Sequence, residues 1–262
     1  MSAYQTILFE VSDAVARITL NRPTVANALN GQMSRDLFDV SNRCDEDPGI
    51  RAVVLTGAGS LFCGGGDLQE FDGSDDLAST IKRTVSYLHG AISRFARMDA
   101  PIIGAINGTA GGAGMSFVCM CDMAIAAESA KFTMAYTGGG LTPDGSSTYY
   151  LPRLIGLRRA LDLTLTNRRL TATEALEWGL INQICPDDQV LDKATQLATR
   201  LAAGPTLAYG TSKRLLRLSM TESLETQMEN EARAIANSTR TEDAKEGIAA
   251  FLEKRAPQFK GK

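Results

Sequence analysis

Residues 101–114 read Pro-Ile-Ile-Gly-Ala-Ile-Asn-Gly-Thr-Ala-Gly-Gly-Ala-Gly, a short apolar run that leads into a glycine-rich turn. The run from 101 to 106 has the length and composition of a strand that is covered on both faces. Apolar residues continue from about Gly112, which predicts a helix directly after the turn. A strand, a glycine-rich turn and a helix in this order form one unit of an α/β fold.

The same pattern occurs about fifty residues earlier in the chain. Ala52–Thr56 is another buried-strand candidate, and Phe62-Cys63-Gly64-Gly65-Gly66-Asp67-Leu68 is another glycine-rich turn. The spacing indicates repeated α/β units and does not fit a solenoid period. We therefore predict an α/β fold.

The segments on either side extend this prediction. Two β-prone runs at 6–11 and 14–20 are spaced like a hairpin, and 123–127 reads as a further strand. Beyond about residue 155 the pattern is mostly helical, and Thr171 with Glu174 forms a capping-box signature. Gly204-Pro205 marks a boundary, so we predict a core over 1–203. A helical region over 204–262 then carries apolar stripes that fit packing on the chain's own core or on another subunit, and we assign it to oligomerisation.

The composition excludes several classes of function. The 262-residue chain is 44% hydrophobic with a net charge of −3, and no block of like charges favours nucleic acid or a membrane surface. Five scattered cysteines and no signal-peptide pattern predict a cytoplasmic protein. A single histidine makes a metal site or a Ser-His-Asp triad hard to assemble, so we expect no metal.

The glycine turns suggest chemistry by the backbone. A helix that begins at such a turn presents unpaired N–H groups and a partial positive charge. Two such turns at one point would stabilise a developing oxyanion. Tight packing is the alternative explanation for the glycines. Neither turn matches a dinucleotide or phosphate-loop motif.

Four stretches together resemble the crotonase family, the enoyl-CoA hydratase/isomerase superfamily. They cover nearly the whole chain in order, and they are Leu20-Asn21-Arg22-Pro23 with Asn27-Ala28-Leu29-Asn30, Val54 to Leu68, Ala105 to Asp122, and Ala250 to Phe259. The resemblance implies a spiral of ββα units with a helical C-terminal region, assembled as a homotrimer or homohexamer. It also implies that the chain binds an acyl-CoA substrate and needs no separate cofactor.

Positions matched to the family suggest roles for individual residues. The oxyanion donors would be the N–H groups of Gly66 and Ala113. The residues that match the family's CoA-binding positions are Ala26, Leu29, Gly64, Asp67, Leu68, Phe251 and Lys254. The last two would reach CoA from a neighbouring subunit, although Lys254 also fits a solvated cation at a helix end.

The resemblance departs from the hydratases at their two catalytic glutamates. Those positions fall at Ser116 and Tyr136, which puts ordinary hydration in doubt. One carboxylate remains nearby, Asp144, in a Pro-Asp-Gly sequence that is also typical of a plain turn. Asp144 matches the aspartate that isomerases of the family use, including isomerases of the phenylacetate-degradation type.

We therefore predict an enoyl-CoA isomerase in which Asp144 carries a proton between two carbon atoms of a thioester-stabilised enolate. One alternative is a hydrolase similar to 4-chlorobenzoyl-CoA dehalogenase, with Asp144 as nucleophile and His89 at the position of its catalytic histidine. His89 also fits a partly buried helix residue. A CoA-binding protein without turnover is a third possibility. Tyr136, Ser116 and His89 are the expected residues of the substrate pocket.

Overall fold

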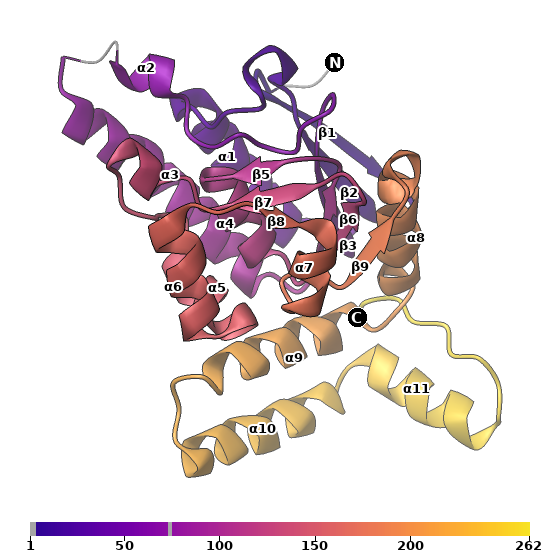
Figure 1. Ribbon diagram of the computed structural model, residues 1–262. Coiled ribbons are helices and arrows are strands. Elements are labelled where there is room, and N and C mark those ends of the chain that lie inside the picture. Colours follow the sequence, from indigo (N-terminus) through magenta and orange to yellow (C-terminus); the bar gives the residue numbers. More distant parts are fainter. Residues whose placement is uncertain (1–3, 73–74) are drawn as a thin grey trace.

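The computed structural model describes residues 4–72 and 75–262, and its largest feature is a six-stranded sheet (Figure 1). The strands lie in the order β1-β2-β3-β4-β6-β9. They are β1 (Ile7–Ser12), β2 (Val15–Leu20), β3 (Ala52–Gly57), β4 (Ile102–Ile106), β6 (Met123–Ala127) and β9 (Gln183–Cys185). β1 and β2 are antiparallel, and every later pairing is parallel.

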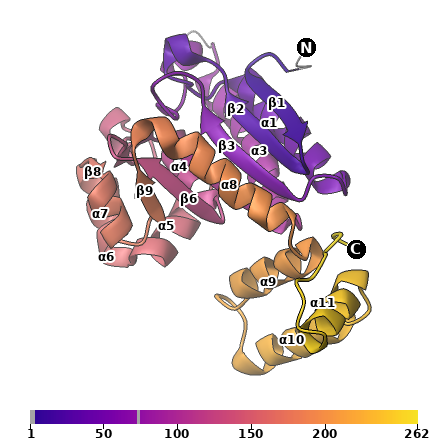
Figure 2. The same ribbon diagram turned by 90° about the vertical axis from the view of Figure 1, so that its right-hand side faces the viewer.

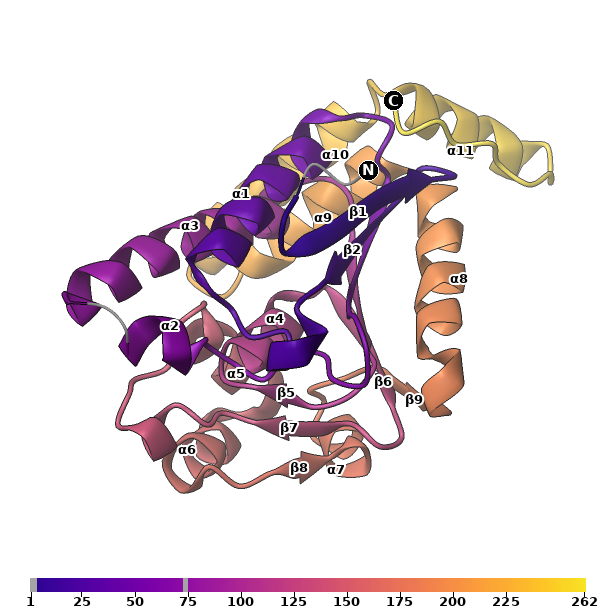
Figure 3. The same ribbon diagram turned by 90° about the horizontal axis from the view of Figure 1, so that it is seen from above.

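Helices cover both faces of this sheet. α8 (Val190–Ala202) lies across one face against β3, β4 and β6, while α1 (Gly31–Glu46) and α3 (Leu77–Arg97) lie together on the other (Figures 2 and 3). β3 and β4 are buried along their whole length, as their uninterrupted apolar sequences predict. No helix in the described ranges is long and apolar enough to cross a membrane.

A second, smaller sheet lies beside the first. It joins β5 (Ala110–Gly111), β7 (Lys131–Thr133) and β8 (Leu170–Thr171) in that order. The helices around it are α2 (Leu68–Asp72), α4 (Ala113–Met120), α5 (Ser147–Ile155), α6 (Leu157–Thr166) and α7 (Ala172–Glu177). β5 is itself part of the second glycine turn, and its pairing with β7 holds that turn in place.

The C-terminal helices form a separate layer below the core (Figure 1). They are α9 (Thr206–Leu218), α10 (Leu224–Ser238) and α11 (Glu242–Leu252). The predicted boundary at residue 204 falls in the turn between α8 and α9. Arg51 of the core donates hydrogen bonds to the Gly204 carbonyl and the Thr206 hydroxyl, and it thereby ties this turn to the start of β3.

The strands predicted near 6–20, 52–56, 101–106 and 123–127 are confirmed within one or two residues at each end. The capping box of Thr171 and Glu174 is present at the start of α7. The prediction of a mostly helical chain beyond residue 155 is incomplete, because β8 and β9 lie there. Both are two or three residues long, and only their pairing with distant strands defines them.

Asn27 connects the first glycine turn to the β2–α1 segment. Its backbone is left-handed, with φ of 52°, and its side chain is fully buried. Its Oδ1 accepts from the Arg22 N–H, and its Nδ2 lies within hydrogen-bond distance of the carbonyl oxygens of Ala58, Leu61 and Phe62. This amide therefore satisfies backbone groups on both sides of the loop.

We expect Asn27→Asp to lower the free energy of unfolding by about 3 kcal/mol or more, because a carboxylate cannot donate to three buried carbonyl oxygens. Urea denaturation measures this loss. Asn237→Asp is the matched control, since Asn237 is exposed and only accepts from Arg240. Equal stability of the two variants would contradict the role given to Asn27.

Candidate active site

The two glycine turns pack backbone against backbone. Gly65 and Gly112 both have positive φ, at 126° and 50°, and a Cβ on Gly112 would lie 3.3 Å from the Gly65 Cα. A Cβ on Gly114 would overlap the Cys63 carbonyl oxygen. Residues that lie about fifty positions apart in the sequence thus meet at a distance that side chains would prevent.

Short parallel bridges determine which backbone groups remain unpaired. Leu29 N donates to Gly65 O at 2.7 Å and Asp67 N donates to Leu29 O at 2.8 Å, so the N–H of the intervening Gly66 points away from this pairing. Ala113 is the first residue of α4, where N–H groups have no partner inside the helix. Neither N–H has a hydrogen-bond acceptor among the described residues.

Both N–H groups lie at one cavity of about 400 Å³. Its walls come from both glycine turns, the chain around Leu68 and Phe71, helix α3 and the segment 135–144. The α3 residues are Ala78, Ile81, Lys82, Thr84 and Val85. Most of these side chains are apolar, and Asp144 is the one carboxylate among the described residues that line the cavity.

Asp144 is oriented by two hydroxyl groups. Tyr136 Oη donates to Asp144 Oδ1 at 2.6 Å, and Ser116 Oγ lies 3.0 Å from Tyr136 Oη and 2.9 Å from the Asp144 carbonyl oxygen. Burial, followed by the nearby Asp144 carboxylate, raises the pKa of Tyr136 well above its ordinary value. The phenol therefore remains protonated and holds one oxygen of the carboxylate.

The three residues predicted for the substrate pocket do not all line this cavity. Tyr136 does, whereas Ser116 is fully buried behind it. His89 lines a neighbouring cavity instead, and its Nε2 accepts a hydrogen bond from the Gly145 N–H at 3.2 Å. His89 therefore contacts the backbone that follows Asp144, and the imidazole does not face the cavity that Asp144 lines.

The residues matched to CoA-binding positions fall into three groups. Leu29, Gly64 and Leu68 line the cavity. Asp67 and Ala26 do not line the cavity. Asp67 pairs with Arg22 at 2.7 Å, and the Ala26 carbonyl oxygen accepts a hydrogen bond from the Gly64 N–H. Phe251 and Lys254 lie at the end of α11, in the helical layer and away from this cavity (Figure 1).

Several cavity residues were not predicted from the sequence. Phe71 lies over Gly66, since a Cβ there would be 3.0 Å from the Phe71 ring. Ile81, Lys82 and Val85 come from the first half of α3. An amphipathic pattern over 77–97 could have indicated that helix, but only the fold shows which part of it faces the glycine turns.

Comparisons with known proteins identify the family of this chain. The family model for "Enoyl-CoA hydratase/isomerase" matches residues 10–262. The chain is 39% identical over 261 residues to 1,2-epoxyphenylacetyl-CoA isomerase of Escherichia coli strain K12, with 98% of each chain covered. It is 35% identical over 250 residues to 4-chlorobenzoyl coenzyme A dehalogenase-1 of an Arthrobacter species, covering 95% of this chain and 91% of the relative.

The fold comparison gives the same result. The crystal structure of an enoyl-CoA hydratase from Bacillus anthracis matches with a TM-score of 0.93 and 34% identity, covering 98% of this chain and all of that one. The crotonase-like α/β fold predicted from the sequence is therefore confirmed. With matches over nearly its whole length, the chain belongs to the enoyl-CoA hydratase/isomerase family.

Proposed function

We propose that the protein is an enoyl-CoA isomerase that moves a double bond along the acyl group of a CoA thioester. The observation that carries this proposal is the pairing of two unoccupied backbone N–H groups, at Gly66 and Ala113, with a single carboxylate, Asp144, around one apolar cavity. No separate cofactor takes part, because CoA enters as part of the substrate.

The thioester oxygen accepts hydrogen bonds from the Gly66 and Ala113 N–H groups. The partial positive charge at the start of α4 adds to this stabilisation. Negative charge that develops on the oxygen is thereby stabilised, and the C–H bonds conjugated with the carbonyl become more acidic. Asp144 removes a proton from one carbon to give the enolate and returns it to another carbon, so the double bond shifts while the composition of the substrate is unchanged.

Tyr136 limits what the carboxylate can do. With Oδ1 occupied by the phenol, the second oxygen of Asp144 is left to take up the proton and to return it. Addition of water would require a further group that holds and orients water. Among the described residues that line the cavity, no second carboxylate serves that purpose, which favours isomerisation over hydration.

We expect Asp144→Asn to reduce kcat for a 3-enoyl-CoA at least about a hundredfold, because the amide cannot accept the proton. Product mass distinguishes the reactions, since isomerisation leaves it unchanged and hydration adds the mass of water. Asp188→Asn changes the same functional group at an exposed position and is expected to retain full activity. Full activity of Asp144→Asn would remove Asp144 from the mechanism.

Tyr136→Phe tests the phenol. Loss of its hydrogen bond to Asp144 Oδ1 is expected to lower kcat about tenfold, because the carboxylate is then no longer held in one orientation. In the wild type, the raised pKa of Tyr136 keeps the phenol protonated, so its ionisation is expected to produce no loss of rate as the pH rises toward 10. Steady-state kinetics from pH 5 to 10 measures both. An unchanged kcat in the variant would contradict this role.

A dehalogenase-like reaction is the second candidate, and the 35% identity to 4-chlorobenzoyl coenzyme A dehalogenase-1 supports it. In that reaction Asp144 would attack the ring carbon as a nucleophile. The position of His89 outside the cavity argues against a histidine that activates water there. Chloride release from 4-chlorobenzoyl-CoA would favour this second candidate, and binding of all these thioesters without turnover would favour a CoA-binding protein.

We also propose that the chain forms a homotrimer or homohexamer through residues 204–262. This layer exposes large apolar side chains to an extent that monomers rarely show. They are Leu216, Met220, Leu224, Met228, Ile235, Ile248, Phe251 and Leu252, and each is at least half exposed. Assembly would cover them and would bring Phe251 and Lys254 toward a neighbouring CoA site.

Two charges placed on this surface test the assembly. We expect Phe251→Glu combined with Leu252→Glu to yield monomers, because burying two carboxylates without partners opposes association. Light scattering after size-exclusion chromatography measures the mass. Leu8→Glu, on the edge strand β1, introduces the same kind of charge elsewhere and is expected to leave the assembly intact. A wild-type monomer would refute the proposal.

A further inference from the structure

A second cavity lies next to the catalytic one, on the other side of the Asp144 segment. It measures about 480 Å³ and is lined by the second half of α3, the start of α5 and the end of α9. Asp144 lines the catalytic cavity and Ser146 lines this one, with Gly145 and its hydrogen bond to His89 between them.

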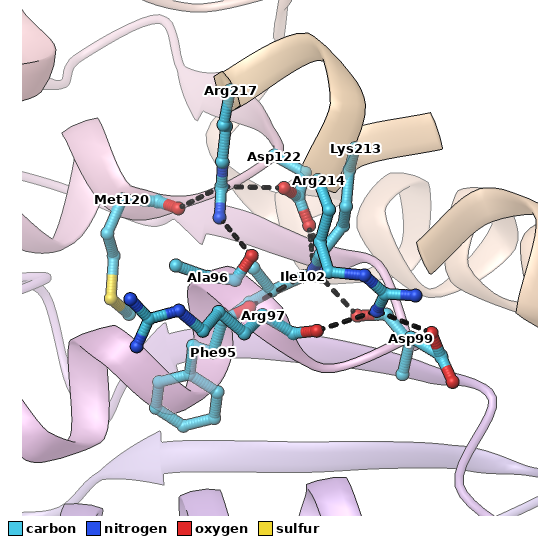
Figure 4. A network of polar contacts seen from close by, with 11 residues as sticks. Phe95, Ala96, Arg97, Asp99, Ile102, Met120, Asp122, Lys213, Arg214 and Arg217 are labelled. Carbon is cyan, nitrogen blue, oxygen red and sulfur yellow. Dashed lines mark hydrogen bonds and ion pairs between the residues drawn. The ribbon is translucent and has the colours of Figure 1, made fainter. Parts of the chain in front are cut away.

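Positive charge gathers around this second cavity. Arg97, Arg214 and Arg217 all line it, and no Asp or Glu does among the described residues. Arg214 pairs with Asp99 at 2.6 Å, whereas Arg217 shares Asp122 with Lys213, at 2.8 and 2.9 Å (Figure 4). Arg97 is exposed and has no carboxylate partner within the described ranges, and its guanidinium donates a hydrogen bond to the Ser93 hydroxyl at 2.7 Å.

The charges in this cluster do not balance. Four cationic side chains, Arg97, Lys213, Arg214 and Arg217, face two carboxylates, Asp99 and Asp122, which leaves an excess of two positive charges in a chain whose net charge is −3. The side chains of the paired Lys213 and Asp122 are only 11% and 14% exposed, whereas Arg97, the cation without a carboxylate partner among the described residues, is exposed. Burial lowers the pKa of Lys213, as expected for a cation that is held away from water.

The remaining walls are apolar and aromatic. Ile92, Ala96 and Leu218 lie beside the rings of Tyr149 and Tyr150, which pack edge to face with centroids 5.1 Å apart. The guanidinium of Arg97 extends away from Asp99 (Figure 4). An anion at this guanidinium would form a charge-assisted hydrogen bond, and an apolar body attached to it would contact the aromatic wall.

We propose that this second cavity binds an organic carboxylate with an apolar or aromatic body, and that Arg97 is its principal charged contact. Two sources share this chemistry. One is a free carboxylic acid, whose binding does not depend on the reaction of Asp144. The other is a carboxylate at the far end of the acyl group, which rests on the proposed function and would define dicarboxylic thioesters as the substrate class.

Calorimetric titration with benzoate tests the site without turnover. We expect saturable binding of benzoate and none of benzyl alcohol, which has a similar body but no charge. Arg97→Met is expected to weaken benzoate binding about tenfold, the usual effect of losing one charge-assisted hydrogen bond. Arg94→Met is the matched control, because Arg94 lies on the same helix and pairs with Asp45 on its other side.

Saturated thioesters separate the two sources, since they bind without reacting. If the carboxylate belongs to the acyl group, suberyl-CoA is expected to bind more tightly than octanoyl-CoA, to displace benzoate and to lose this advantage in Arg97→Met. If it is a free acid, both thioesters bind equally and benzoate binds alongside either one. Two results together would refute the site. The first is that benzoate does not bind, or that it binds Arg97→Met as tightly as the wild type. The second is that Arg97→Met leaves the binding of suberyl-CoA unchanged.

Discussion

The close contact between two glycine turns is the constraint on which the rest of this molecule depends. Gly114 approaches the Cys63 carbonyl oxygen at a distance that excludes a Cβ, and Gly65 and Gly112 both need a positive φ. α4 then begins with its N–H groups directed at the space beside them. The large sheet supplies both turns from neighbouring strands, β3 and β4, because parallel strands end at the same edge. The small sheet and the Asn27 amide fix the turns from outside. Each of these elements is needed to hold two backbone segments together without side chains between them.

Several side chains around these glycine turns hold Asp144 and the segment that carries it. Asp144 lines the cavity, Tyr136 fixes one of its oxygens, and Ser116 and His89 contact the backbone of the same segment from behind. A residue that is restrained at its side chain, its carbonyl and the following N–H keeps one orientation, which the proposed proton transfer between two carbon atoms requires. The second cavity begins on the far side of this segment, so whatever binds there does so within a few residues of Asp144.

The sequence predicted the parts of the fold that depend on local pattern. The buried strands, the two glycine turns and the capping box of α7 all follow from residue type and spacing. β5 and β8, two residues each, could not be predicted, because their existence depends only on pairing with β7. Asp144 and Tyr136 were identified by their positions in the family pattern. Their 2.6 Å contact was not, since an eight-residue separation in an irregular segment specifies no geometry. The position of His89 behind the Asp144 segment could likewise be found only from the fold. The residue pattern around His89 is compatible with either side of that segment.

The proposed polarisation of the substrate by main-chain groups has a consequence for how such a protein can change over time. Gly66 and Ala113 contribute only atoms that every residue except proline has, so ordinary substitutions alter their positions but cannot delete their donors. In the proposed mechanism, the backbone donors are inherited with the fold, whereas the groups that transfer the proton are a few replaceable side chains. A few substitutions are therefore enough to produce a new reaction on the same thioester. Descendants of one ancestor can diverge in chemistry while they retain the same architecture.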